Sequence, residues 1–330
     1  MANLTEDVLS ALAPKIAPGA TGVADLRRLT GGAVQETWAF TLKTPARALP
    51  IVLRRAANPD RTNTMTVPME TEATLMRLAG GGGVPSPHVR YVLTPEDDLG
   101  SGFFMDHVEG EALGGRIVRD PAFADVRPKL ARQCGEIIAR LHSIPRAGLP
   151  PLQTIGAAET IADLEASHRH EQWPRPVFEL AFRWLKARLP KEAERITLVH
   201  GDFRNGNLLI GADGVRAVLD WELAHLGDPM QDLGWMCVNS WRFGAIDKPV
   251  GGFGAREDMY AGYEAAGGVK VDPERVRFWE ALGVLRWGVM CTFSTVTLKG
   301  PGPFTVDRPM IARRASECEL DLLDIMEGAR

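Results

Sequence analysis

The sequence predicts an α+β protein of two lobes, in which a small antiparallel sheet precedes a mainly helical part. Three observations support this fold class. Short apolar or alternating segments, separated by turns rich in Gly and Pro, dominate residues 1–108, as antiparallel strands do. Amphipathic segments with apolar residues at helical spacing dominate residues 109–330. The length of 330 residues is ample for two lobes and a sizeable core.

The composition excludes several classes of protein. With 45% hydrophobic and 24% charged residues, the chain has the composition of a soluble globular protein. The formal net charge is −4 and no run of like charges occurs, so no nucleic-acid partner is expected. The four cysteines are far apart and form no C-x-x-C. This spacing predicts neither a zinc knuckle nor a disulfide framework, and it favours the reducing cytosol.

No segment favours a membrane. The N-terminal residues 1–16 lack the basic region and long apolar core of a signal peptide. The most apolar stretch, residues 282–298, contains Arg286 and several Ser and Thr residues, so a buried helix is expected there. A cytoplasmic protein without a membrane partner is predicted, and the sequence carries no signal for its oligomeric state.

The elements of the first lobe are predicted in order. Residues 3–17 have the pattern of an amphipathic helix with Thr5 as its N-cap. Strands are expected over residues 23–29, 37–42 and 51–55, a helix over 69–78, and a further strand pair over 89–93 and 102–108. Between the first two strands, Gly31 and Gly32 would let backbone N–H groups approach a phosphate closely. A hairpin turn is the commoner reason for such a pair of glycines.

Helices dominate the second lobe. They are expected over residues 123–144, 159–171, 177–189, 256–266, 273–298 and 308–327. Asp228 followed by Pro229 predicts the start of another helix, with Asp at the N-cap and Pro at the first position. Residues 239–254 are rich in Gly and aromatic side chains, which indicates a loop at the border of a substrate pocket or a plain connection.

The chemistry is expected in the stretch 198–222. Two apolar residues lead into His200-Gly201-Asp202, and Asn207 follows before a second apolar run. Gly211-Ala212-Asp213-Gly214 then supplies a turn, and the strand after it ends on Asp220. Such a hairpin would bring Asp220 back beside the loop that carries Asp202 and Asn207. Two carboxylates and one amide without an obvious basic partner suit a hard divalent cation and a hydroxyl that must be oriented.

The order Asp, four residues, Asn and a later Asp is that of the catalytic parts of protein kinases. In full, the segments HGDFRNGNLL, VLDWE and GDPMQDLG resemble the aminoglycoside phosphotransferase family. That family includes choline-kinase-like enzymes and the phosphotransferase domains related to acyl-CoA dehydrogenase-linked kinases. The resemblance extends over nearly the whole chain and is concentrated in residues 198–234. It implies a two-lobed protein-kinase-like fold, with residues 1–108 as the nucleotide-binding lobe and residues 109–330 as the catalytic and substrate lobe.

The resemblance also implies a reaction and its residues. ATP, with GTP as the alternative nucleotide, would phosphorylate a hydroxyl of a small molecule in the presence of Mg²⁺. Asp202 would orient or deprotonate that hydroxyl, and Asn207 and Asp220 would bind Mg²⁺. His200 is expected to brace the loop, and Asp232 to hold the backbone of the catalytic loop. These last two are structural roles.

Further residues would contact the nucleotide. Gly31 and Gly32 resemble the loop that covers the phosphates. Arg54 stands where protein kinases have a Lys, and its guanidinium can bind phosphate through two N–H groups. Glu72 on the following helix is its expected partner, and Glu70 is the competing candidate. A solvated strand end is the alternative interpretation of Arg54.

The segment after the last strand of the first lobe would join the lobes and contact adenine. The carbonyl of Asp106 and the amide of Val108 are the expected contacts, with a plain strand end as the alternative. Arg204 is a candidate for contacting either the transferred phosphate or the acceptor. The family does not name that acceptor, since aminoglycosides, choline, amino alcohols, sugars and hydroxyacyl thioesters are all conceivable.

Two other functions compete with a small-molecule kinase. A metal-dependent phosphohydrolase is suggested by Gly201-Asp202 and Gly206-Asn207, but the upstream D-x-H is lacking and Leu208 stands where a His is needed. A nucleotide-binding pseudokinase that acts as a regulatory scaffold is suggested only by Arg54 at the Lys position. The presence of all three expected catalytic and metal-binding residues argues against it.

Overall fold

Five strands near the N-terminus form one antiparallel sheet. The computed structural model describes residues 4–29, 35–56, 66–170, 174–296 and 306–328. The strands are β1 (Gly22–Leu29), β2 (Gln35–Lys43), β3 (Ala48–Ala56), β4 (Val89–Val92) and β5 (Gly102–Asp106). Their order across the sheet is β1-β2-β3-β5-β4, so β3 and β5 are neighbours although a helix and a strand separate them in the chain.

Both faces of this sheet are buried in its centre. Successive side chains of a strand point to opposite faces. Accordingly Phe104 packs with α1 (Glu6–Ile16), whereas Phe103 and Met105 join the large core of the helical part. The helix α1 begins as predicted, because the backbone N–H of Val8 donates to the Thr5 hydroxyl at 3.3 Å. The sheet is therefore held from one side by α1 and from the other by the rest of the molecule.

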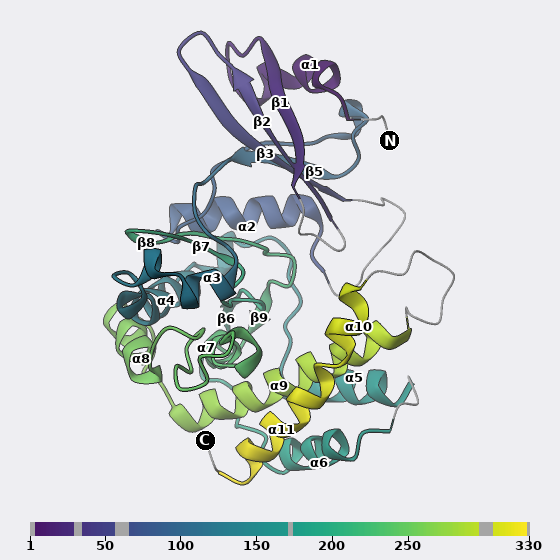
Figure 1. Cartoon of the computed structure of the whole chain (residues 1–330), viewed down its shortest axis with the longest axis vertical. Helices are drawn as coiled ribbons and strands as arrows, with labels where there is room; N and C mark the ends of the chain where they lie inside the picture. Colours follow the sequence, from purple (N-terminus) through teal and green to yellow (C-terminus); the bar gives the residue numbers. More distant parts are fainter. Residues whose placement is uncertain (1–3, 30–34, 57–65, 171–173, 297–305, 329–330) are drawn as a thin grey trace.

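The helix α2 (Met69–Gly81) lies between the sheet and the helical part (Figure 1). The chain on either side of it is bound to a segment far along the sequence. The Val67 N–H donates to the Glu222 carbonyl at 2.8 Å, and the Val218 N–H donates to the Pro85 carbonyl at 2.8 Å. These bonds join the segment that contains Asp220 to both flanks of α2.

The helical part contains nine further α-helices among the described residues. They are α3 (Gly114–Arg119), α4 (Arg127–His142), α5 (Ala157–His170), α6 (Pro176–Lys186), α7 (Met230–Met236), α8 (Arg256–Ala265), α9 (Pro273–Val296), α10 (Asp307–Ala312) and α11 (Ala315–Met326). Figure 1 shows α9 crossing this part, with α6 and α11 on one side of it. No helix in the described ranges is long and apolar enough to cross a bilayer.

Two predicted helices have different bounds in the structure. The helix expected over 123–144 begins at Arg127, because Pro121–Phe123 forms a separate short 3₁₀ turn and Pro128 lies in the first turn of α4. The helix expected over 308–327 is two helices. Between them the Arg314 N–H donates to the Ile311 carbonyl at 2.9 Å, a tighter i to i−3 bond that ends the first helical register.

Two small antiparallel pairs position the polar loop after residue 199. The strands β6 (Thr197–Val199) and β9 (His225–Gly227) pair, which places the start of α7 next to the loop that follows β6. The strands β7 (Leu208–Gly211) and β8 (Gly214–Val218) form the predicted hairpin. The sheet at one end and the helices at the other confirm the predicted α+β class with a small antiparallel sheet and a mainly helical part.

Candidate active site

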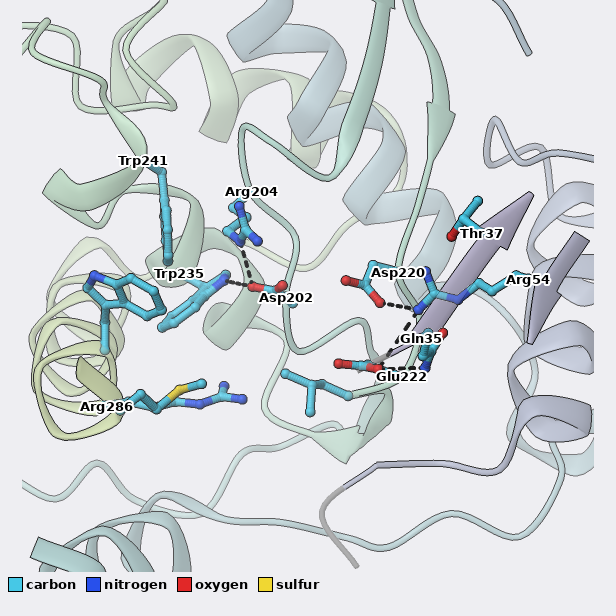
Figure 2. A pocket seen from close by; sticks show the side chains of 13 residues that line it. Gln35, Thr37, Arg54, Asp202, Arg204, Asp220, Glu222, Trp235, Trp241 and Arg286 are labelled. Atoms are coloured by element: carbon cyan, nitrogen blue, oxygen red, sulfur yellow. Dashed lines mark hydrogen bonds and ion pairs between the residues drawn. The ribbon is translucent and has the colours of Figure 1, made fainter. Parts of the chain in front are cut away.

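A cavity of about 280 Å³ lies where the first sheet, the β7–β8 hairpin and α9 meet. The residues that line it are Gln35, Thr37, Arg54, Asp202, Arg204, Asp220, Glu222, Leu223, Trp235, Trp241, Arg286, Trp287 and Met290. Figure 2 shows Asp202 between two groups of side chains. Arg54, Asp220 and Glu222 lie on the side of the sheet, and Trp235 and Trp241 lie on the other side.

Asp202 is fixed by three side-chain donors. Its Oδ1 accepts from Trp235 Nε1 at 2.8 Å and from Arg204 Nε at 3.0 Å. Its Oδ2 accepts from Asn207 Nδ2 at 2.6 Å. Arg204 and Asn207 belong to the same loop as Asp202, and Trp235 belongs to α7, so donors on both oxygens give the carboxylate one orientation. It is held as an acceptor at the wall of the cavity.

Asp232 holds the backbone that carries Asp202. The fully buried carboxylate accepts the N–H of His200 at 2.9 Å and the N–H of Gly201 at 3.0 Å. His142 Nε2 lies 3.2 Å from its Oδ2. Burial opposes ionisation, but the hydrogen bonds from His142 and from the His200 N–H outweigh it and lower the pKa of Asp232. Gly201 is required here, because its φ is +78° and a Cβ would lie 2.3 Å from the Leu223 carbonyl oxygen.

We expect Asp232→Asn to lower the free energy of unfolding by about 2–4 kcal/mol, since an amide cannot accept from all three donors. The lowered pKa gives the pH dependence its sign. A carboxylate with a folded pKa below its unfolded value contributes stability above that unfolded value, and the contribution disappears as the pH falls. Urea unfolding should therefore show a difference in the free energy of unfolding between the wild type and Asp232→Asn at pH 7. This difference should shrink below about pH 4.

The exposed Asp247 provides the matched control for this substitution. Asp247→Asn should leave the urea midpoint unchanged. A difference for Asp232→Asn that persisted at low pH would contradict the assignment of the effect to the carboxylate charge.

His200 is a buried, neutral support for the same loop. Its Nδ1 accepts the N–H of Asp202 at 3.2 Å, and its ring packs against Trp221 with 4.8 Å between centroids. Burial lowers the pKa of His200, so the imidazole is uncharged at neutral pH. Its contacts are with the loop backbone and the core.

Arg54 is surrounded by carboxylates. Its Nε lies 3.2 Å from Glu72 Oε1, and its Nη2 lies 2.5 Å from Asp220 Oδ1 and 3.8 Å from Glu222 Oε2. Glu70, the competing candidate, is exposed on α2. Glu72 is buried, and burial raises its pKa even though Arg54 acts in the opposite direction. Glu72 Oε1 also accepts the Trp221 N–H at 3.3 Å, next to Asp220.

The hairpin brings Asp220 beside Asn207. The Leu219 N–H donates to the Asn207 carbonyl at 2.8 Å, and Asp220 then has a φ of +65°. Asp is among the few residues that adopt this left-handed conformation readily. Two residues later, burial and the charge of Asp220 raise the pKa of Glu222 to about 7. This end of the cavity therefore has a surplus of carboxylates over its single described cation, Arg54.

Comparisons with known proteins show the family of this chain. The family model of the phosphotransferase enzyme family matches residues 25–279. The chain belongs to this family. It is thus a kinase-type phosphotransferase, as the resemblance of its motifs predicted.

Solved structures show the fold of this phosphotransferase. A candidate aminoglycoside phosphotransferase from Ralstonia eutropha is similar with a TM-score of 0.74 at 21% identity, with 98% of each chain covered. A spectinomycin phosphotransferase in complex with ADP and spectinomycin has a TM-score of 0.61 at 14% identity, covering 99% of this chain and 98% of the other. An aminoglycoside phosphotransferase in ternary complex with AMP-PNP and hygromycin B has a TM-score of 0.63 at 17% identity, covering 94% and 95%. The two-lobed kinase-like fold is confirmed.

Curated relatives match part of the phosphotransferase. Acyl-CoA dehydrogenase family member 10 of Mus musculus is 29% identical over 182 residues, which are 52% of this chain and 16% of the relative. Acyl-CoA dehydrogenase family member 11 of Homo sapiens is 29% identical over 164 residues, which are 46% of this chain and 20% of the relative. The match therefore spans a fifth or less of the length of these two relatives.

Four of the residues predicted to contact the nucleotide are not placed at this cavity by the described structure. Gly31 and Gly32 are outside the described residues. Asp106 ends β5 with its carboxylate paired to Arg90, and Val108 follows it, half-buried. Neither of these two lines the cavity that contains Asp202. The predicted border loop does contribute, because Trp241 is part of the cavity wall.

Other residues of the phosphotransferase cavity were not predicted. Glu222 follows Asp220 at a distance of two residues, so both side chains could have been considered together. Gln35 donates to Glu222 Oε2 at 2.8 Å from β2, which no local pattern indicates. Arg286 lies in α9, and its Nη1 donates to the Gly201 carbonyl at 3.2 Å. A lone cation in the apolar stretch 282–298 was the available signal for Arg286.

Proposed function

We propose that this chain transfers the γ-phosphoryl group of ATP to a hydroxyl of a small molecule, with Mg²⁺ as the metal. The observation that carries the proposal is that Asp202 and Asp220 line the same cavity. Asn207 joins them, because its side chain donates a hydrogen bond to Asp202 and its carbonyl accepts one from the N–H of Leu219, the residue before Asp220. Membership of the phosphotransferase enzyme family supports phosphoryl transfer. The adenine nucleotides in two structural neighbours support ATP, and GTP is the alternative.

In the proposed reaction, Asp202 receives the acceptor hydroxyl. The hydroxyl oxygen attacks the γ-phosphorus, the bond from that phosphorus to the β–γ bridging oxygen breaks, and ADP leaves with the electron pair. The hydroxyl proton passes to the Asp202 carboxylate. Phosphoryl transfer needs positioning and electrostatic stabilisation more than covalent chemistry, and the three donors on Asp202 provide that positioning.

The residues at the sheet side of the cavity fit Mg²⁺. Mg²⁺ prefers oxygen ligands, and it commonly uses one or two carboxylates together with phosphate oxygens and water. Asp220 with the neighbouring Asn207 can supply such ligands, and the Arg54 guanidinium against Asp220 supports a preference for positive charge there. No cluster of three or more His, Cys, Asp or Glu side chains in the described ranges forms a complete metal site by itself. When bound, Mg²⁺ supplies neutralisation of the phosphate charge.

The proposal assigns the nucleotide to the lobe of residues 1–108 and the acceptor to residues 109–330. Arg54, held by Glu72, would contact the phosphates through its guanidinium. The predicted contacts of adenine with the Asp106 carbonyl and the Val108 amide, and of the phosphates with Gly31 and Gly32, stay predictions. His200 and Asp232 act through the loop backbone that they hold.

The two competing functions have less support. Family membership favours transfer of a phosphoryl group over metal-dependent hydrolysis. A pseudokinase scaffold would not need Asp202, Asn207 and Asp220 in one arrangement with an ion-paired Arg54 and Glu72.

Thermal unfolding with nucleotide tests the proposal. ATP with Mg²⁺ should raise the unfolding temperature by roughly 5 °C at 100 times its dissociation constant, because a ligand of the folded state stabilises it. ATP with EDTA should give a much smaller shift. The absence of any shift with ATP or GTP, with and without Mg²⁺, would contradict the proposal.

A further inference from the structure

The acceptor side of the cavity has an unusual chemical character. Beyond Asp202 its described lining consists of Arg204, Arg286, Trp235, Trp241, Trp287 and Met290. Arginine and tryptophan side chains donate hydrogen bonds and accept none. The other carboxylates of the cavity, Asp220 and Glu222, lie on the opposite side with Arg54, as Figure 2 shows. A ligand on the acceptor side would therefore meet donors and positive charge.

Asp202 does not neutralise this side. Arg204 Nε donates to Asp202 Oδ1 at 3.0 Å, and Asp202 is the only carboxylate partner of Arg204 among the described residues. The same carboxylate also accepts from Trp235 and Asn207. Its negative charge is thus shared among several donors. One carboxylate faces two guanidinium groups.

Arg286 has no carboxylate partner in the described part of the chain. Its Nη1 donates to the Gly201 carbonyl at 3.2 Å, next to the loop that holds Asp202. Its guanidinium carbon lies 5.0 Å from the ring centroid of Trp235. An arginine remains charged in proteins, and the carboxylates of Asp202 and Asp232 are near enough to act on this charge without forming an ion pair with it. A half-buried cation without a direct ion pair favours a ligand that supplies one.

The indole rings of this side are already in contact with cations. Arg204 lies 4.5 Å from the ring centroid of Trp241, and Arg314 lies 5.7 Å from that of Trp287. With Arg286 on Trp235, each of the three rings has an arginine over one face. A cationic acceptor would have to compete with these arginines for the rings and would be repelled by them.

We propose that the acceptor of this enzyme carries an anionic oxygen group, a carboxylate or a phosphate, beside its hydroxyl. The inference rests on the proposed kinase function and names the class of its second substrate. The anionic group binds Arg286 and Arg204, and an apolar or flat body of the acceptor packs on the tryptophans. The hydroxyl is then presented to Asp202. Polycationic amino sugars and amino alcohols are excluded by the same charges.

The first experiment compares acceptors that share one skeleton and differ in charge. 3-Phenyllactate, its neutral amide and the cationic 1-amino-3-phenylpropan-2-ol carry the same benzyl group and secondary hydroxyl. 2-Hydroxy-3-phenylpropyl phosphate replaces the carboxylate by phosphate, and kanamycin represents a polycation. Binding to the enzyme with Mg²⁺ and AMP-PNP is followed by tryptophan fluorescence, and phosphorylation with Mg²⁺ and ATP by ADP release. We expect at least about tenfold tighter binding of an anion than of the amide, and no phosphorylation of the amine or of kanamycin.

The second experiment assigns the charge preference to a residue. In Arg286→Gln the preference for the anion over the amide should fall about 10-fold or more, and Arg286→Lys should restore part of it. The effect should be larger on KM than on kcat. Arg188→Gln is the matched control, because Arg188 also covers an indole, that of Trp184 at 4.4 Å, and lines a different cavity. It should keep the preference of the wild type.

The outcomes separate the two proposals. A protein that binds no nucleotide would contradict the kinase function itself. Nucleotide binding together with tighter binding of the amine or kanamycin than of either anion would overturn only the anionic acceptor. The anionic acceptor would also be overturned if neither anion binds more tightly than the amide, or if Arg286→Gln keeps the wild-type preference for the anion over the amide. Comparison of the carboxylate with the phosphate then shows which anionic group the site takes.

Discussion

Asp202→Asn is expected to reduce kcat for phosphoryl transfer by about 10²–10⁴-fold, the usual contribution of a positioned base. The amide cannot take the proton of the acceptor hydroxyl. It also disturbs the site, because Trp235, Arg204 and Asn207 donate to the two oxygens and an NH₂ group at either position would face a donor. Phosphorylation of the best acceptor, measured by ADP release, checks the prediction.

Nucleotide binding separates this effect from unfolding. The thermal shift caused by Mg²⁺ and ATP should remain in Asp202→Asn, because Asp202 is not a proposed metal ligand and Asn207 contacts it through Nδ2, which leaves the Asn207 side-chain oxygen for the metal. The matched control is Asp213→Asn in the exposed turn between β7 and β8, where the carboxylate pairs only with Arg216 among the described residues. This control should keep the wild-type rate. An unchanged kcat in Asp202→Asn would remove Asp202 from the reaction and favour a nucleotide-binding scaffold.

Asp220→Asn is expected to weaken the apparent affinity for Mg²⁺ by at least about 100-fold. Loss of a residue that only supports a metal ligand typically costs 10–100-fold, and Asp220 is proposed as a ligand itself. Asparagine is the appropriate replacement, because it adopts the positive φ of +65° that Asp220 has. The measurement is a Mg²⁺ titration of the thermal shift at saturating ATP.

The same substitution also removes a partner of Arg54. The guanidinium keeps Glu72 at 3.2 Å, so we expect the unliganded variant to remain folded, as its unfolding temperature would show. Asp213→Asn again serves as the control, with an unchanged Mg²⁺ dependence. A wild-type Mg²⁺ titration in Asp220→Asn would place the metal ligands at other residues.

The core of the site could be predicted because it is local in sequence. Asp202, Asn207 and Asp220 lie on one loop and one hairpin, and a hairpin needs only a turn and two short strands to bring its ends together. The acceptor side is different. Trp235, Trp241 and Arg286 come from α7, a 3₁₀ turn and α9, and only tertiary packing places them around Asp202.

The expected pairing of Arg54 with Glu72, and not with the competing Glu70, is found in the structure, and the helix pattern explains it. Glu72 lies three residues after the buried Met69 and three before the buried Leu75, so it is on the apolar face of α2. Glu70 points away from that face and is exposed.

The ends of helices were harder to predict. The amphipathic spacing includes Phe123, but a 3₁₀ turn occupies Pro121–Phe123 and α4 begins only after it. The spacing also continues through Arg313, where a hydrogen bond from the Arg314 N–H to the Ile311 carbonyl ends α10.

The bonds between the flanks of α2 and the segment 218–222 have a mechanical consequence. Val67, Glu72 and Pro85 are bound to Glu222, Trp221 and Val218, so α2 is fastened at three points to the strand end that carries Asp220. Although α2 is encoded among the first 108 residues, it must travel with the catalytic segment whenever the sheet tilts. The pivot of any opening motion then lies between α2 and the strands, and the pair Arg54 and Glu72 spans that pivot. A tilt of the sheet relative to α2 would therefore lengthen this ion pair together with the contacts of Arg54 with Asp220 and Glu222.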